Sequence, residues 1–299
     1  MQTLEALGRR IATTNDLKSI VRTMKALSAV SIHQFDQAAR SIEIFSAVVE
    51  LGLEVGLRQA EVHAPASPRR DGAPIAIVVG SDHGLCGRFN EQIAKRAATV
   101  PEAHPGATAS GRPRWLAVGH RLASRMEADG LAPAATLELP ASVEGLTRVA
   151  DTILTIVDAW RSEGAAGGVA VVHNERRGGT TAVPSQTQLL PLSASWEADL
   201  RSRSWTGPSL PMTTMASSAL LAGLIREHLF GAVFRALAAS LASEHATRLA
   251  AMQAAERNIE EHLATMNADY RRRRQEAITE ELLDVVAGFE ALAPARQSA

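Results

Sequence analysis

Apolar residues recur at helical spacing through the first 58 residues of the chain. Most stand three or four positions apart, mostly with charged residues between them, at Leu4, Leu7, Ile11, Leu17, Val21, Met24 and Leu27. This spacing puts the apolar side chains on one face of a helix. Residues 1–58 are therefore predicted to form one helix, which would be about 85 Å long at 1.5 Å per residue.

The C-terminal part of the chain, residues 212–292, has the same texture. Near its end the apolar positions alternate in steps of three and four, as in coiled coils, at Leu282, Val285, Phe289 and Leu292. Proline costs about 3 kcal/mol inside a helix, and none of the chain's 13 prolines lies in residues 1–64 or 212–293. A second uninterrupted helix is therefore predicted here.

The middle of the chain, residues 65–211, alternates short apolar runs with amphipathic stretches and holds twelve of the 13 prolines. Short runs of this kind are typical of buried parallel strands, and the amphipathic stretches are typical of covering helices. Strands are predicted at residues 75–79, 115–118, 135–139 and 169–173, helices at 90–98, 120–128 and 143–161, and an edge strand at 183–192. The alternation predicts an α/β sandwich with a mainly parallel sheet.

A long helix with an exposed apolar seam needs a partner, and each predicted helix is the available partner of the other. The predicted fold class is α/β plus coiled coil: long N- and C-terminal helices form an antiparallel coiled coil and flank a Rossmann-like α/β domain. The predicted domains are a coiled-coil helix at 1–60, the α/β domain at 65–211, a coiled-coil helix at 212–292 and a tail at 293–299.

Composition excludes several classes of protein. The formal net charge is -1, so no strong field favours nucleic acid or anionic lipid. Cys86 is the only cysteine, which excludes an internal disulfide and a zinc site built from cysteines. No run of about 18 apolar residues marks a membrane span, and residues 1–20 lack the pattern of a secretory signal. An intracellular protein without bound metal or cofactor is expected.

Two segments have an alternative functional interpretation. Residues 80–90 follow a strand and precede a helix, where phosphate can bind. Their glycine spacing fits neither the dinucleotide fingerprint nor a P-loop, so Gly84 and Gly87 are predicted to serve a tight structural turn. Residues 271–274 are four consecutive arginines, which would spread around a helix axis rather than form one nucleic-acid-binding face. The Cys86 thiol beside His83 is predicted to be structural rather than nucleophilic.

Five segments in order resemble the gamma subunit of F-type ATP synthases. They are residues 10–27, the glycine turn at 81–90, the extended segment at 183–192, and the helical segments at 241–248 and 274–282. Departures occur at His83 and Arg88, where the family usually has arginine and a further glycine. They suggest a divergent, alternative bacterial member of the family.

The resemblance implies a rotor rather than an enzyme. Its two helices would turn as a shaft inside the hexamer of alpha and beta subunits, and its α/β domain would meet the epsilon subunit and the membrane c-ring. The protein would hold no nucleotide. It would be peripheral, at the cytoplasmic face of the cell inner membrane, and would couple proton or sodium translocation to ATP synthesis or hydrolysis by biasing the affinity of the beta subunits.

The resemblance also implies particular contact residues. Met24 and Lys25 match positions on the N-terminal helix that meet a loop of the beta subunit. The positions on the C-terminal helix that match hexamer-facing residues are Arg248, Gln275, Thr279 and Glu280. Two other hypotheses remain at this point: a coiled-coil adaptor or nucleic-acid scaffold that uses the four arginines, and a nucleotide-binding enzyme that uses the turn at 80–87.

Overall fold

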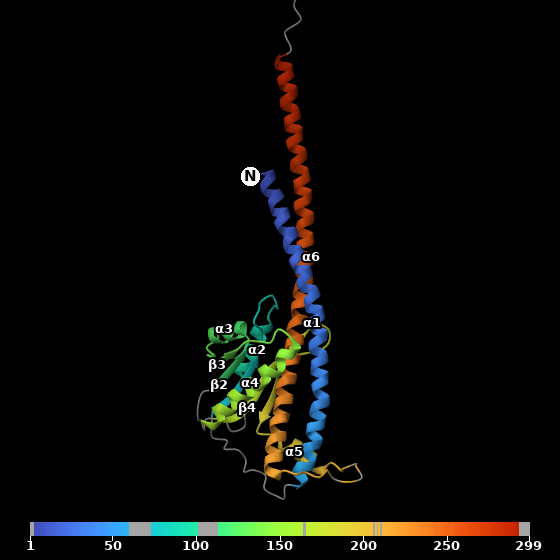
Figure 1. Ribbon diagram of the computed structural model, residues 1–299. Coiled ribbons are helices and arrows are strands. Elements are labelled where there is room, and N and C mark those ends of the chain that lie inside the picture. The colour runs from blue at the N-terminus through green and yellow to red at the C-terminus, as the bar shows by residue number, and fades with distance from the viewer. Residues whose placement is uncertain are drawn as a thin grey trace, which may run out of the picture. The chain divides into compact units, whose positions relative to one another are not determined.

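The computed structural model describes residues 3–59, 73–100, 113–163, 166–205, 207, 209 and 211–292 (Figure 1). Along the chain, the helices are α1 Leu4–Gln59, α2 Phe89–Ala98, α3 His120–Ala128, α4 Val143–Ser162, α5 Ala194–Ser202 and α6 Ser217–Leu292. The strands are β1 Ala73–Val79, β2 Arg114–Val118, β3 Ala135–Leu137, β4 Ala166–Arg176 and β5 Ala182–Leu190. The predicted tail at 293–299 lies outside the described residues.

The two long helices are confirmed as α1, with 56 residues, and α6, with 76. Two glycines near the end of α1 let the two long helices approach closely. A Cβ atom built on Gly52 would lie 2.9 Å from Leu224 Cδ2, and one on Gly56 would lie 2.9 Å from Leu221 Cδ2. Leucines of α6 therefore fill the space that a side chain on α1 would need.

The described strands form one five-stranded sheet in the order β3-β2-β1-β4-β5. Strands β1 to β4 run parallel, and β5 pairs antiparallel with β4 at the edge. The mainly parallel sheet and its edge strand are thus as predicted. Strand β4 is longer than predicted, because its last residues pair only with β5 beyond the end of β1.

The core of the α/β domain lies on both faces of β1, in which residues 75–79 are fully buried. Ile75, Ile77 and Val79 pack in one cluster with α4 and α6, and Ala76 and Val78 pack in another with α2 and α3. This alternation follows from the two-residue period of a strand. Helix α6 is therefore a core helix of this domain as well as a long helix.

Helix α5 was not predicted from the sequence. Its Leu200 is fully buried against Val49 and Leu53 of α1, and the ring of its Trp196 lies 4.5 Å from that of His228 on α6. At nine residues, α5 is too short to show a clear helical period. Its place depends on contacts with both long helices.

The chain divides into two compact units. One unit comprises residues 27–251 and contains the sheet with its covering helices. The other combines the described residues up to Ala26 with those from Met252 onward. The predicted domain boundaries, which follow sequence segments, stay a prediction. In the described part of the chain, no helix combines the length and apolarity that crossing a membrane needs.

Candidate partner-binding surface

Charged side chains join α1 to α6 in the unit that combines the described residues up to Ala26 with those from Met252 onward. Lys18 Nζ lies 2.8 Å from Oε1 of Glu260, and Lys25 Nζ lies 2.5 Å from Oε2 of Glu256. The Nε atom of Arg22 donates to the same Glu256 at 2.7 Å. Hydrogen bonds from Lys25 and then Arg22 lower the pKa of Glu256 to about 2. The two helices run antiparallel, because residue numbers rise on one as they fall on the other.

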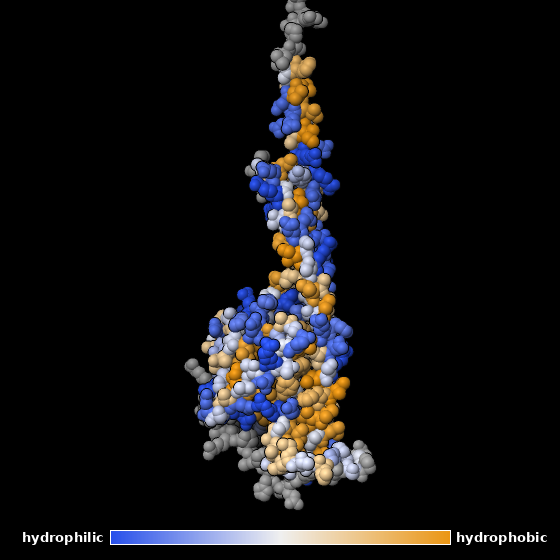
Figure 2. Space-filling model, viewed as in Figure 1, coloured by the Kyte–Doolittle hydropathy of each residue, from blue (hydrophilic) through white to orange (hydrophobic). Residues whose placement is uncertain are grey.

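Apolar side chains of the same unit stay exposed. On α1, Leu17 is 50% and Ile20 55% exposed, although Leu7 is buried. On α6 the exposed set is Ile278, Leu282, Leu283, Val285, Val286 and Phe289. Figure 2 shows that one side of the last turns of α6 is apolar and another hydrophilic. Exposed apolar surface of this extent marks an interaction site.

The register of the two helices explains the exposure at the end of α6. A Cβ atom built on Gly8 would lie 3.6 Å from the ring of Tyr270, so these two residues stand side by side. Helix α1 begins one turn before Gly8, at Leu4, whereas α6 continues from Tyr270 to Leu292. The last turns of α6 therefore extend past the first residue of α1.

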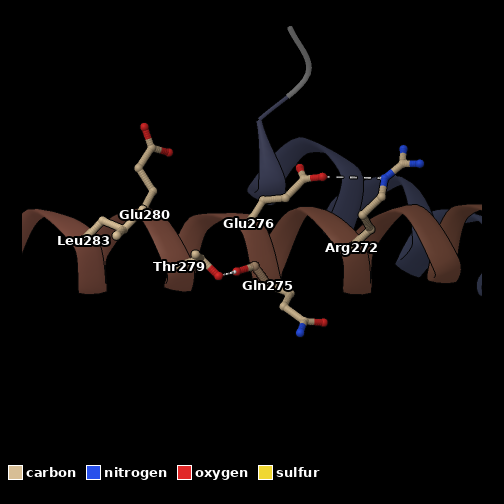
Figure 3. A pocket seen from close by; sticks show the side chains of 6 residues that line it. All are labelled: Arg272, Gln275, Glu276, Thr279, Glu280 and Leu283. Atoms are coloured by element: carbon tan, nitrogen blue, oxygen red, sulfur yellow. Dashed lines mark hydrogen bonds and ion pairs between the residues drawn. The ribbon is translucent and has the colours of Figure 1, made fainter.

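Three of the predicted contact residues line one shallow groove on this part of α6 (Figure 3). Its volume is about 410 Å³, and it is lined by Arg272, Gln275, Glu276, Thr279, Glu280 and Leu283. Glu276 and Glu280 point to the same side of the helix, and Gln275 points to the opposite side. The hydroxyl of Thr279 donates to the carbonyl oxygen of Gln275 at 2.9 Å. Gln275, Thr279 and Glu280 are all exposed.

Met24 and Lys25 lie together on α1, and both are half-buried. The ammonium group of Lys25 is engaged by Glu256, so its charge is already paired within the chain.

Arg248 differs from the other predicted contact residues, because it is buried within the unit of residues 27–251. Its guanidinium is ion-paired with Glu244, one helical turn away, and lies 3.3 Å from Nδ1 of His245. Burial raises the pKa of Glu244. Burial, followed by the charge of Arg248, lowers the pKa of His245 to about 4. The neutral imidazole can therefore accept a hydrogen bond from Arg248 at neutral pH.

The glycine turn between β1 and α2 places its two glycines differently. Gly87 has a φ of +58°, which favours glycine. Around Gly84, a Cβ atom would meet nothing within 4 Å. The other left-handed residue of the turn is Leu85, with a φ of +65° and 60% exposure. The sequence pattern did not single out Leu85, because leucine rarely adopts this conformation.

Side chains hold this turn at the carboxyl end of the sheet. The Asn90 side chain accepts from the Ser81 backbone N–H at 3.0 Å and donates to the Ser81 hydroxyl at 2.7 Å. The Asp82 carboxylate accepts from the backbone N–H groups of His120 and Leu139, each at 2.7 Å. His120 is the first residue of α3. The carboxylate thus occupies the anion-binding position at a helix N-terminus, where a phosphate would otherwise bind.

Helix α6 contacts β1 and β4 near their carboxyl ends. Mainly parallel sheets usually bind ligands between two such neighbouring strands, where the strand order reverses. The Ser240 hydroxyl donates to the Val79 carbonyl oxygen of β1 at 3.3 Å, and the Ser243 hydroxyl donates to the Asn174 carbonyl oxygen of β4 at 3.1 Å. Cys86 is buried, and burial raises the pKa of its thiol. These features oppose both a nucleotide site and a thiolate nucleophile at the turn.

The four arginines of α6 do not form a single basic face. Nε of Arg271 donates to the Asn267 carbonyl oxygen at 3.3 Å. Arg272 pairs with Asp269 at 3.0 Å and lies 3.9 Å from Glu276. The charge of Arg272 is thus partly compensated by acidic residues one helical turn away, which weakens the case for a nucleic-acid scaffold.

Comparison with known proteins gives one consistent family. A family model described as "ATP synthase" matches residues 3–292. An "ATP synthase gamma chain" of Anaeromyxobacter sp. (strain Fw109-5) is 28% identical over 305 residues, which cover 98% of this chain and all of the relative. The protein of the same name from Chlorobium phaeobacteroides (strain BS1) is 29% identical over 298 residues, covering 98% and 99%.

Solved structures with the same fold come from rotary complexes. A chain of the Euglena gracilis mitochondrial ATP synthase, in a structure of OSCP, F1 and c-ring, superposes with a TM-score of 0.64 at 15% identity, covering 99% of this chain and 96% of that one. A chain from the central stalk and c-ring of the Tetrahymena thermophila mitochondrial ATP synthase gives 0.54 at 18% identity, covering 79% and 99%.

Proposed function

The chain belongs to the ATP synthase family that includes these gamma chains, and we propose that it is the rotor of the central stalk in a bacterial F-type ATP synthase. In this role it couples ion translocation through the membrane c-ring to ATP synthesis or hydrolysis on the hexamer of alpha and beta subunits. The rotation angle of the two long helices sets which beta subunit binds nucleotide tightly. Rotation angle and nucleotide affinity are therefore linked by a coupling free energy.

The observation that supports this function best is the exposed apolar surface at the end of α6. Phe289 is 79% and Val285 65% exposed on a helix that extends past the start of α1. A helix in water gains most of its stability by burying an apolar face. The surrounding alpha and beta subunits supply the apolar partner that α1 does not supply at the end of α6.

Three of the contact residues for the hexamer lie on the same part of α6. We assign Gln275, Thr279 and Glu280 to it, because they are exposed and line one groove. Met24 and Lys25 are assigned to a loop of a beta subunit. Contact through Arg248 requires its guanidinium to leave Glu244, so this contact costs more to form than contact through the exposed Gln275, Thr279 and Glu280.

The remaining assignments concern the α/β domain. We assign to it contacts with the epsilon subunit and with the c-ring, on the cytoplasmic face of the inner membrane. A non-catalytic role accords with Asp82, which fills the anion position at the start of α3, and with Ser240 and Ser243, which tie α6 over the strand ends. The chain therefore transmits force, and the partner subunits perform the chemistry.

Native co-purification tests the proposal. The tagged chain is expressed together with the alpha and beta subunits encoded in the same genome, and the complex is isolated at low ionic strength. The expected result is a stable complex with ATPase activity, and no ATP hydrolysis by the isolated chain. Failure of the chain to associate with alpha and beta subunits under these conditions would contradict the rotor function.

A further inference from the structure

Three elements meet at the end of β4, and each touches the other two. Helices α1 and α6 meet where the rings of Phe35 and His245 stack, with centroids 5.7 Å apart and an interplanar angle of 10°. Helix α6 meets β4 where Ser243 donates to the Asn174 carbonyl oxygen. Helix α1 meets β4 where Arg176 Nη2 lies 2.5 Å from Asp36 Oδ2. We call these six residues the junction.

The extension of β4 makes the junction possible. Strand β1 pairs with β4 only as far as Val172. Residues His173 to Arg176 continue as a two-stranded ribbon with β5, in which Arg176 pairs with Ala182. The ribbon brings a cation from the sheet to a carboxylate on α1, a connection that the sheet core does not provide.

The junction contacts are directional, unlike the core around them. Ala38 of α1 and Leu241 of α6 pack with the sheet in one apolar cluster. Apolar contacts are non-directional, so they set the rotation of one helix against another less strictly than a directional contact does. A hydrogen-bonded ion pair constrains both distance and angle. Asp36–Arg176 therefore fixes the register and the rotation of α1 against the sheet.

We propose that the junction is the site at which torque passes between the two long helices and the α/β domain, and that Asp36 and Arg176 are the positioning pair that holds α1 in this path. This inference rests on the proposed rotor function and deepens it. Helices α1 and α6 both run without interruption through residues of the 27–251 unit and through residues of the other unit. A twist of either helix reaches the sheet through the junction contacts.

The Asp36–Arg176 ion pair is weak, and this weakness separates a role in torque transfer from a purely structural role. The side chains of Arg176 and Asp36 are 32% and 25% exposed, and pairs of this exposure contribute little to folding. Their loss should leave the chain folded and assembled. A torque path predicts in addition that rotation and ion transport become less tightly coupled, which a purely structural role does not.

The test uses the complete complex in sealed vesicles and measures ions transported per ATP hydrolysed. Asp36→Arg should lower this ratio by about fivefold, the change that about 1 kcal/mol produces, with ATP hydrolysis retained. Asp36→Asn should lower it less. The exchange variant, Asp36→Arg with Arg176→Asp, should restore it, because attraction returns with the charges reversed.

Glu163→Arg is the matched control. It replaces the ion pair of Glu163 with Arg114, at 2.6 Å, by two like charges. That pair joins β2 to the end of α4 and includes no residue of either long helix. Its ratio should equal that of the unchanged complex. Equal ratios for Asp36→Arg and Glu163→Arg, or no recovery in the exchange variant, would overturn the inference. Loss of assembly in Asp36→Arg would overturn it too, by making the pair structural. Failure of the unchanged chain to assemble would instead contradict the rotor function.

Discussion

Lys25 on α1 and Glu256 on α6 are 231 positions apart in the sequence, yet Nζ of the first lies 2.5 Å from Oε2 of the second. Arg22 binds the other oxygen of the same carboxylate. One acidic residue on α6 therefore fixes the position of two basic residues on α1. Where Lys25 and Arg22 meet Glu256, the contact between α1 and α6 depends on charge as well as on apolar packing.

This arrangement predicts a dependence of stability on pH. The folded pKa of Glu256 is lowered to about 2 from an ordinary value of 4.5, so its contribution to stability is present above pH 4.5 and is lost as pH falls toward 2. Glu256→Gln should lower the melting temperature at pH 7, and the difference from the unchanged chain should shrink below pH 4.5. Circular dichroism melts measure this. Glu261→Gln, at an exposed position of the same helix, is the control and should show no such trend.

The buried pair of Arg248 and Glu244 predicts a strong effect on folding. Arg248→Met leaves the Glu244 carboxylate buried without its cation, which should cost about 3–5 kcal/mol. The double variant Arg248→Met with Glu244→Gln should cost much less, since it leaves no uncompensated charge. Urea unfolding of the isolated chain measures both. Equal losses in the single and double variants would show that the pair does not act as a unit.

The two glycines of the turn should respond differently to alanine. Gly87→Ala should destabilise the chain by about 1–2 kcal/mol, because Gly87 has a φ of +58°. Gly84→Ala should be close to neutral, because a Cβ atom there meets nothing within 4 Å. Chemical denaturation compares the two variants directly. A larger loss at Gly84 would contradict this description of the turn.

The exposed end of α6 should matter for assembly and not for folding. Phe289→Asp combined with Leu282→Asp should leave the circular dichroism spectrum and melting temperature of the isolated chain nearly unchanged, because both residues are exposed. Co-purification with the alpha and beta subunits should fall sharply, because each new carboxylate would be buried against an apolar surface of these subunits. Met212→Asp changes a residue that is 92% exposed and lies outside α6, and should leave this co-purification intact.

Continuity of α6 should be needed for coupling. Ala255→Pro removes a backbone hydrogen bond and clashes with the preceding turn, at a cost of about 3 kcal/mol. It should abolish coupling between ion transport and ATP hydrolysis while the α/β domain stays resistant to limited proteolysis. Ala255→Ser keeps the backbone hydrogen bond and should behave as the unchanged chain. Normal coupling in Ala255→Pro would mean that an intact helix is not required.

The sequence by itself determined the long helices, the succession of strands along the chain and the mainly parallel sheet. These features depend on local patterns: absence of proline, helical spacing, and continuous apolar runs such as residues 75–79. The side-chain periods of a strand and of a helix are set over a few residues. Such patterns can therefore be interpreted before any long-range contact is known.

Only the tertiary structure decided which side chains meet. Sequence reasoning did not find helix α5, the ribbon at the end of β4, the anion position filled by Asp82, or the contact between Asp36 and Arg176. It treated Arg248 as a surface contact, whereas the structure buries Arg248 with Glu244. The physical reason is that burial and ion pairing join residues distant in sequence. Their energies depend on distance and solvent exposure, which a linear pattern does not contain.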